Sequence, residues 1–176
     1  MLHWSEKMDV SFIGTIIELK TIGDADEKYY FHSWDRYYAN LKLTIFGYIT
    51  KDILVQYCAE GPKDLENVVI KMNEIMPTLD PPFYTLFCPI FRSICRNSGT
   101  FVPDPLNDVR GDYSTRWSGW DLRERFEIST YDDPFNGEGV RHETEWHKEN
   151  YTDCMKANRA RLQIERDILL KITESR

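Results

Sequence analysis

The first third of the chain alternates apolar and polar positions with the two-residue period of strands. Residues 10–19 are rich in β-branched and apolar side chains, which predicts a central strand. Two further apolar runs cover residues 41–50 and 53–58, and only Lys51 and Asp52 separate them. Two residues are enough for a tight turn, so this part of the chain predicts an antiparallel hairpin.

Helical periodicity and turn residues organise the rest of the chain. Asp64 is placed to cap a helix over 65–76, and a short buried strand is expected over 83–87. The next segments are predicted, in order, as a helix over 89–96, a loop over 97–113, a helix over 117–126, a turn cluster over 132–139 and a helix over 144–175 that is broken near Asn150. This order predicts one α/β domain, with a mixed sheet flanked by helices.

Composition narrows the class of protein. The chain has 176 residues, of which 41% are hydrophobic and 14% aromatic, as expected for a folded globule. No apolar run reaches the roughly 18 residues that a membrane span needs, and the first residues lack the pattern of a signal peptide. We therefore expect a cytoplasmic protein with no membrane partner. The net charge of −7 and the lack of a basic run predict that any nucleic-acid contact is local and weak.

Three segments follow one another at intervals that suit an active site in an α/β fold. They are Glu18-Leu19-Lys20-Thr21-Ile22-Gly23, Cys88-Pro89-Ile90-Phe91-Arg92 and Ala157-Asn158-Arg159-Ala160-Arg161. In order and spacing they resemble the active-site segments of ribonuclease H-like 3′–5′ exonucleases of the DnaQ type, particularly the prokaryotic branch of small exonuclease-like proteins. The resemblance implies a ribonuclease H-like domain over residues 1–176. An active member would need Mg²⁺ or Mn²⁺.

The resemblance also implies that most catalytic carboxylates are replaced. Residue by residue, the four metal-binding positions of the family carry Glu18, Lys20, Arg92 and Arg161 here. The positions of the general base carry Lys156 and Ala157, and neither side chain is a useful base. A second register places Glu18 on the family's Glu and Ile16 on its Asp, and it keeps one ligand. Cationic side chains repel metal ions, so we predict a degenerate site without cofactor.

Two interpretations of the basic positions stay open. Lys20, Arg92 and Arg161, with Asn158 nearby, could bind a phosphate or single-stranded DNA or RNA without a metal. Alternatively, they pair with acidic neighbours as a charged remnant. Glu165 lies one helical turn after Arg161 on the same face, so we expect these two to pair.

Two other groups of residues suggest a function. His142 and His147 resemble a zinc-binding pair, but residues five apart on a helix face different directions, which excludes a shared metal. Residues 21–38 are predicted as a loop or hairpin whose aromatic side chains serve sheet packing or a dimer interface, with base stacking as the alternative. The competing functions are therefore a degenerate exonuclease-like protein, an active exonuclease with shifted ligands, and a homodimeric interaction module.

Overall fold

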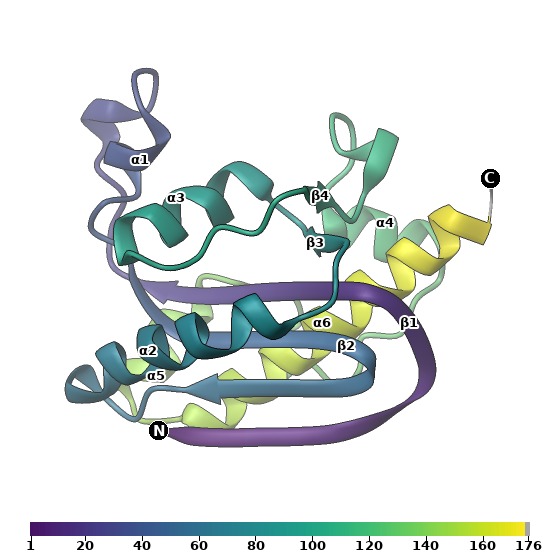
Figure 1. The fold of residues 1–176 in the computed structure, drawn as a ribbon, viewed down its shortest axis with the longest axis horizontal. Coiled ribbons are helices and arrows are strands. Elements are labelled where there is room, and N and C mark those ends of the chain that lie inside the picture. Colours follow the sequence, from purple (N-terminus) through teal and green to yellow (C-terminus); the bar gives the residue numbers. More distant parts are fainter. Residues whose placement is uncertain (175–176) are drawn as a thin grey trace.

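The computed structural model describes residues 1–174, which form an α/β domain around one mixed sheet (Figure 1). Its four strands lie in the order β2-β1-β3-β4, and their bounds are Leu2–Ile22 for β1, Lys42–Cys58 for β2, Phe83–Thr85 for β3 and Leu106–Asp108 for β4. β2 runs antiparallel to β1, whereas β1, β3 and β4 are parallel to one another. The predicted α/β class with a mixed sheet is confirmed.

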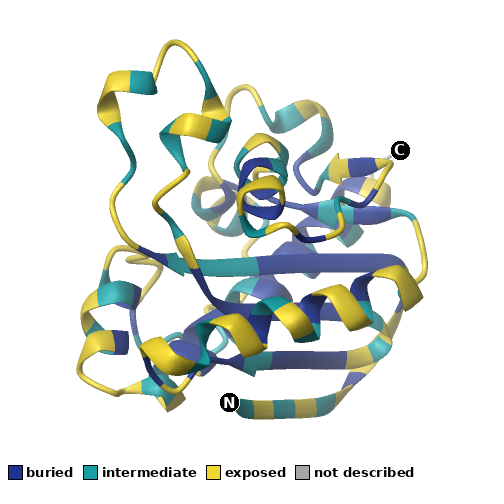
Figure 2. Cartoon of the chain, turned by 60° about the vertical axis from the view of Figure 1, so that its left-hand side comes forward, coloured by how far each residue is buried: buried dark blue, intermediate teal, exposed yellow. Residues whose placement is uncertain are grey.

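Helices cover both faces of this sheet. α2 (Leu65–Ile75) crosses one face, and the long helix α6 (Tyr151–Glu174) crosses the other (Figure 1). The other α-helices are α1 (Trp34–Tyr37), α3 (Cys88–Ser98), α4 (Gly119–Arg125) and α5 (Arg141–His147). Figure 2 shows that the buried positions gather in the sheet and on the inner sides of these helices. No helix among residues 1–174 combines the length and the apolar character that crossing a membrane requires.

The predicted hairpin is present as a bend within β2 (Figure 1). Lys51 has a φ of 54°, in the left-handed region that tight hairpin turns require. Just after the end of β2, Ala59 N donates a hydrogen bond back to Thr44 O over 2.9 Å. β1 is bent as well, since residues 2–7 pair with 53–58 and residues 15–22 pair with 42–50.

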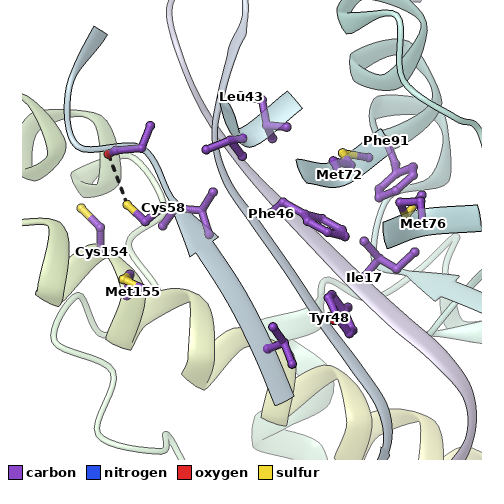
Figure 3. Packing of buried hydrophobic residues seen from close by; sticks show 14 of the residues in the cluster. Ile17, Leu43, Phe46, Tyr48, Cys58, Met72, Met76, Phe91, Cys154 and Met155 are labelled. Atoms are coloured by element: carbon purple, nitrogen blue, oxygen red, sulfur yellow. Dashed lines mark hydrogen bonds between the residues drawn. The ribbon is translucent and has the colours of Figure 1, made fainter. Parts of the chain in front are cut away.

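Alternation along β1 decides which side chains enter the core and which face α6. Ile17 and Phe46 are fully buried and lie with Met72 and Met76 on the α2 side of the sheet, next to Phe91 of α3 (Figure 3). Burying an aliphatic or aromatic side chain of this size contributes about 1.5–3 kcal/mol. The residue after Ile17 points to the opposite face, toward α6, because successive side chains in a strand alternate.

Several boundaries differ from the sequence-based expectations. β1 starts at Leu2 rather than at residue 10, and the predicted loop over 97–113 contains the short strand β4. Asp64 stands at the N-cap position of α2 but does not cap it, since its carboxylate accepts a hydrogen bond from Glu60 N. The C-terminal helix is broken near Asn150 as predicted, into α5 and α6, and its expected last residue lies outside the described residues.

Candidate functional site

Two ionisable residues of β1 and two of α6 meet on the face of the sheet that α6 covers. Lys20 points to the same face of β1 as Glu18, and its Nζ lies 2.8 Å from Glu18 Oε1. On α6, Arg161 Nε donates to Glu165 Oε1 over 3.0 Å, which confirms the predicted pairing. Glu165 and Glu18 are close enough to shift each other's pKa, so the strand pair and the helix pair are joined. We call Glu18, Lys20, Arg161 and Glu165 the Glu18 network.

Burial gives the two carboxyl groups of the network different charge states. Glu165 is fully buried, and burial together with the negative charge of Glu18 raises the pKa of Glu165 well above its ordinary value. Burial also opposes ionisation of Glu18, but Lys20 and Arg161 outweigh it and lower the pKa of Glu18. These directions favour Glu18 as the carboxylate, and we infer that Glu165 keeps the proton between the two groups. Glu165 Oε2 is buried and meets no hydrogen-bond donor among the described residues, which suits an oxygen that carries a proton.

The charges around the network cancel. Because Glu165 is neutral, Lys20 and Arg161 exceed the carboxylate of Glu18 by one positive charge. Asp133 lies close enough to Arg161 to interact electrostatically with it, and so offsets that charge. The Asp133 carboxylate accepts hydrogen bonds from two backbone amides of its own turn, over 2.8 and 2.9 Å. The cations are therefore matched by fixed acidic groups of the protein.

Arg92 does not join the network. It lies on α3, and its Nη2 donates to Leu106 O of β4 over 3.3 Å. Phe91, the preceding residue, turns into the core instead. Of the three cations considered for an anion site, the structure therefore brings Lys20 and Arg161 to one place and directs Arg92 to another.

Asn158 is placed by packing between α6 and β2. It is fully buried, and its Nδ2 donates to Gln56 Oε1 over 3.0 Å. Gln56 in turn donates to Met155 O over 2.9 Å. A Cβ atom at Gly47 would lie only 2.5 Å from Asn158 Nδ2, so glycine at position 47 lets the helix approach the strand closely. These contacts give Asn158 a role in docking α6 onto the sheet.

A hollow of about 150 Å³ opens next to the network, between β1, α3 and α6. Glu18 and Arg161 form its polar end, and its other walls are largely apolar: Leu19, Thr85, Leu86, Phe87, Ile90, Phe91 and Ile94. An apolar cavity of this size is large enough for a benzene-sized group. Leu19, Ile90 and Phe91 stand in the sequence segments quoted above, whereas residues 85–87 and Ile94 gave only an apolar run around a proline and were not predicted as part of a site.

His142 lies on the other side of Lys20 and Arg161, where it lines a second, smaller hollow. Thr44 Oγ1 donates to Lys20 O, so it accepts from His142 Nε2, which is 2.8 Å away. Burial, with the charge of Lys20, lowers the pKa of His142 to about 3, and the ring is neutral. His147 is exposed and lies 3.7 Å from Glu143, so the two histidines do not face a common ligand.

The donor set of the network does not fit a catalytic metal ion. Mg²⁺ and Mn²⁺ sites are built from several carboxylate oxygens. Here Lys20 Nζ lies 2.8 Å from Glu18 Oε1, and Arg161 Nε lies 3.0 Å from Glu165 Oε1, so both carboxyl groups already face cations of the protein. Within residues 1–174 no group of three or more His, Cys, Asp or Glu side chains is arranged to hold a metal ion. We therefore derive no metal-dependent step from this site.

The aromatic side chains of residues 24–40 form a separate feature, which we call the aromatic arm. It projects from the sheet and leans on α3 (Figures 1 and 2). Its rings contact one another rather than packing on the strands, in contrast to the expectation of sheet packing. The short helix α1 and a 3₁₀ turn at Glu27–Tyr29 give the arm its shape.

Comparisons of the chain with protein-family models, with curated proteins and with solved structures found no match.

Proposed function

We propose that this chain is an exonuclease-like domain of the ribonuclease H type that does not hydrolyse nucleic acid and acts by binding. The observation that carries the proposal is the 2.8 Å ion pair between Lys20 and Glu18, with the pair of Arg161 and Glu165 at 3.0 Å beside it. Two-metal hydrolysis needs carboxylates that hold two cations about 4 Å apart. In this site the positive charge comes from the protein itself.

The arrangement of the strands supports the ribonuclease H-type part of the proposal. The long strand β1 lies between an antiparallel partner, β2, and a parallel partner, β3, and a further parallel strand follows. Glu18, Arg161 and the hollow lie where β1, α3 and α6 approach one another, which is where the resemblance leads us to expect an active site. This agreement concerns positions and not chemistry.

Nucleic-acid binding at this site is proposed to be weak. Lys20 and Arg161 already have acidic partners, and Arg161 keeps only about a quarter of its side chain exposed (26%). A site that offers one or two phosphate contacts gives a shallow salt dependence, with a slope near −0.7 per contact for single strands. We expect affinity for oligo-dT or oligo-rU no tighter than roughly micromolar at physiological salt.

The decisive test is an exonuclease assay with a matched variant. Purified protein is incubated with end-labelled single-stranded DNA and RNA, with Mg²⁺, with Mn²⁺ or with a chelator. We expect no metal-dependent shortening of either substrate. Shortening that requires metal and disappears in Glu18→Ala, but persists in Glu6→Ala, would show that the site is active. Glu6 is the control because it also forms an ion pair between β1 and α6, with Arg159 at 2.7 Å.

A further inference from the structure

The aromatic arm carries the densest group of exposed rings among the described residues. Phe31 is 88% exposed, Trp34 is 46% exposed and Tyr30 is 45% exposed. Large apolar side chains that cluster on a surface mark interaction sites, whereas single exposed ones are common. All three belong to the segment that contains α1, and this segment projects from the body of the domain (Figures 1 and 2).

Contacts within the arm hold the rings in a fixed arrangement. Tyr30 meets Phe31 and Tyr37 edge-on, with ring centroids 4.7 and 5.4 Å apart, and Trp34 stacks on Tyr38 at 5.7 Å. Because the rings already constrain one another, a partner would order few side chains on binding.

Contacts at the base of the arm fix it to α3. The Asp35 carboxylate accepts from Ser93 Oγ at 2.8 Å and lies 3.3 Å from Arg96. Asn97 donates to the backbone carbonyl of Asp35 over 2.8 Å. The arm is therefore attached to the domain through side chains that do not take part in its exposed ring surface.

Charge decides which partner suits this surface. Residues 24–40 contain four acidic and two basic side chains, so with a neutral His32 the arm carries −2 within a chain of −7. A phosphate backbone or an anionic lipid surface would be repelled. Two copies of the arm would also repel each other. A cationic partner is attracted both by the carboxylates and by the ring faces, which bind ammonium and guanidinium groups.

The arm already shows this type of contact internally. Lys28 Nζ lies 4.7 Å from the centre of the Tyr29 ring, and the guanidinium of Arg36 lies 5.3 Å from the same ring. Both basic side chains of the arm are thus engaged with Tyr29. The exposed rings of Phe31 and Trp34 have no cation over them in the contacts found among residues 1–174.

We propose that the aromatic arm is a docking surface for an arginine- or lysine-bearing segment of another protein. The segment would place its cations over the exposed rings and close to the acidic side chains at the start of the arm, Asp24, Asp26 and Glu27. This inference does not depend on the Glu18 network, because it uses different residues on a different part of the surface. The two proposals can therefore fail separately.

A peptide-binding experiment tests the docking surface. The probes are fluorescent twelve-residue peptides that alternate glycine with arginine, glutamine or glutamate, together with a twelve-nucleotide oligo-dT of matched label. The protein variants are Phe31→Ser with Trp34→Ser, and a control pair, Ile13→Ser with Val140→Ser, at two apolar positions outside the arm that are 87% and 85% exposed. Circular dichroism checks that every variant is folded.

We expect the arginine peptide to bind the wild type best and to bind the arm variant at least about tenfold more weakly, with little change in the control. Asp24→Asn with Glu27→Gln should also weaken binding. The proposal is overturned if the arginine peptide does not bind, if both pairs of variants weaken it equally, or if oligo-dT binds more tightly. It is also overturned if the arm variant turns a dimer into a monomer in size-exclusion chromatography, since the surface would then serve a second copy.

Discussion

If Glu165 keeps the proton between the two carboxyl groups, replacing glutamate by glutamine should cost less stability at position 165 than at position 18. Glu165→Gln should be close to neutral at pH 5, near the ordinary pKa of a glutamate, because a glutamine amide can donate to Glu18 as the protonated carboxyl does. Its Oε1 can still accept from Arg161, which donates to Glu165 over 3.0 Å in the wild type. We expect a change in the free energy of unfolding below about 1 kcal/mol, since both hydrogen bonds are kept.

Glu18→Gln should have the larger effect, although it is chemically the same change. It removes the carboxylate that faces Lys20 and Arg161, whose side chains are largely shielded from water. Removing one partner of a buried pair costs roughly 3–5 kcal/mol. Lys20 is partly exposed, and Glu165 can ionise once the charge of Glu18 is gone, so we expect a smaller loss of about 1–3 kcal/mol at pH 7.

The raised pKa of Glu165 also predicts how the stability of Glu165→Gln, relative to the wild type, changes with pH. The folded-state pKa of Glu165 is raised, so its contribution is complete below the unfolded value near 4.5 and is lost as pH rises toward the folded value. Within that window one proton corresponds to about 1.4 kcal/mol per pH unit. Glu165→Gln cannot lose this proton. Its stability relative to the wild type should therefore increase with pH above 4.5.

Urea denaturation at intervals between pH 5 and pH 8, followed by tryptophan fluorescence, measures these differences. Glu6→Gln controls for the loss of a carboxylate from another β1–α6 ion pair. The reasoning is refuted if Glu165→Gln loses more than about 2 kcal/mol at pH 7 and shows no relative gain at higher pH. That result would mean that Glu165 is ionised and that its ion pair with Arg161 is the stabilising contact.

Three further outcomes follow from the same contacts. Gly47→Ala should lower stability by about 1–3 kcal/mol in thermal or urea unfolding, because its Cβ would lie 2.5 Å from Asn158 Nδ2, and an unchanged stability would contradict the close approach. His142→Gln should make the free energy of unfolding less dependent on pH between about pH 3 and 6.5. The wild-type ring has its pKa lowered to about 3, so in this range it gains a proton when the protein unfolds. Lys20→Glu combined with Arg161→Asp should gain Mn²⁺ binding that raises the melting temperature, whereas the wild-type melting temperature should not respond to Mn²⁺.

The sequence predicted those parts of the site that depend on local spacing. The four-residue interval on α6 predicted the pair of Arg161 with Glu165, and the alternation of side chains along β1 accounts for the shared face of Glu18 and Lys20. Both relations hold within a single element. Their contact across the domain depends on how α6 docks on the sheet, which no periodicity in the sequence specifies.

Tertiary packing explains where the prediction was incomplete. β4 is only three residues long and lies among proline and glycine residues, so its pairing with β3 gave no visible pattern. Arg92 was assigned to the site from its place in a motif, but the turn of α3 directs it to Leu106 O. The raised pKa of Glu165 depends on full burial and on a carboxylate from a strand far away in the sequence. Such properties require the folded environment.

Two cations beside Glu18 affect the stability of the fold as well as the chemistry of the site. A site with four carboxylates facing one another is strained by mutual repulsion until a metal ion binds. In this chain Lys20 and Arg161 supply the positive charge permanently, and Glu165 lowers the remaining negative charge by keeping its proton. The junction between β1 and α6 is therefore electrostatically complete without a ligand. A domain built in this way loses the affinity for metal that hydrolysis requires, but it can keep a rigid framework that presents a separate surface, such as the aromatic arm, to a partner.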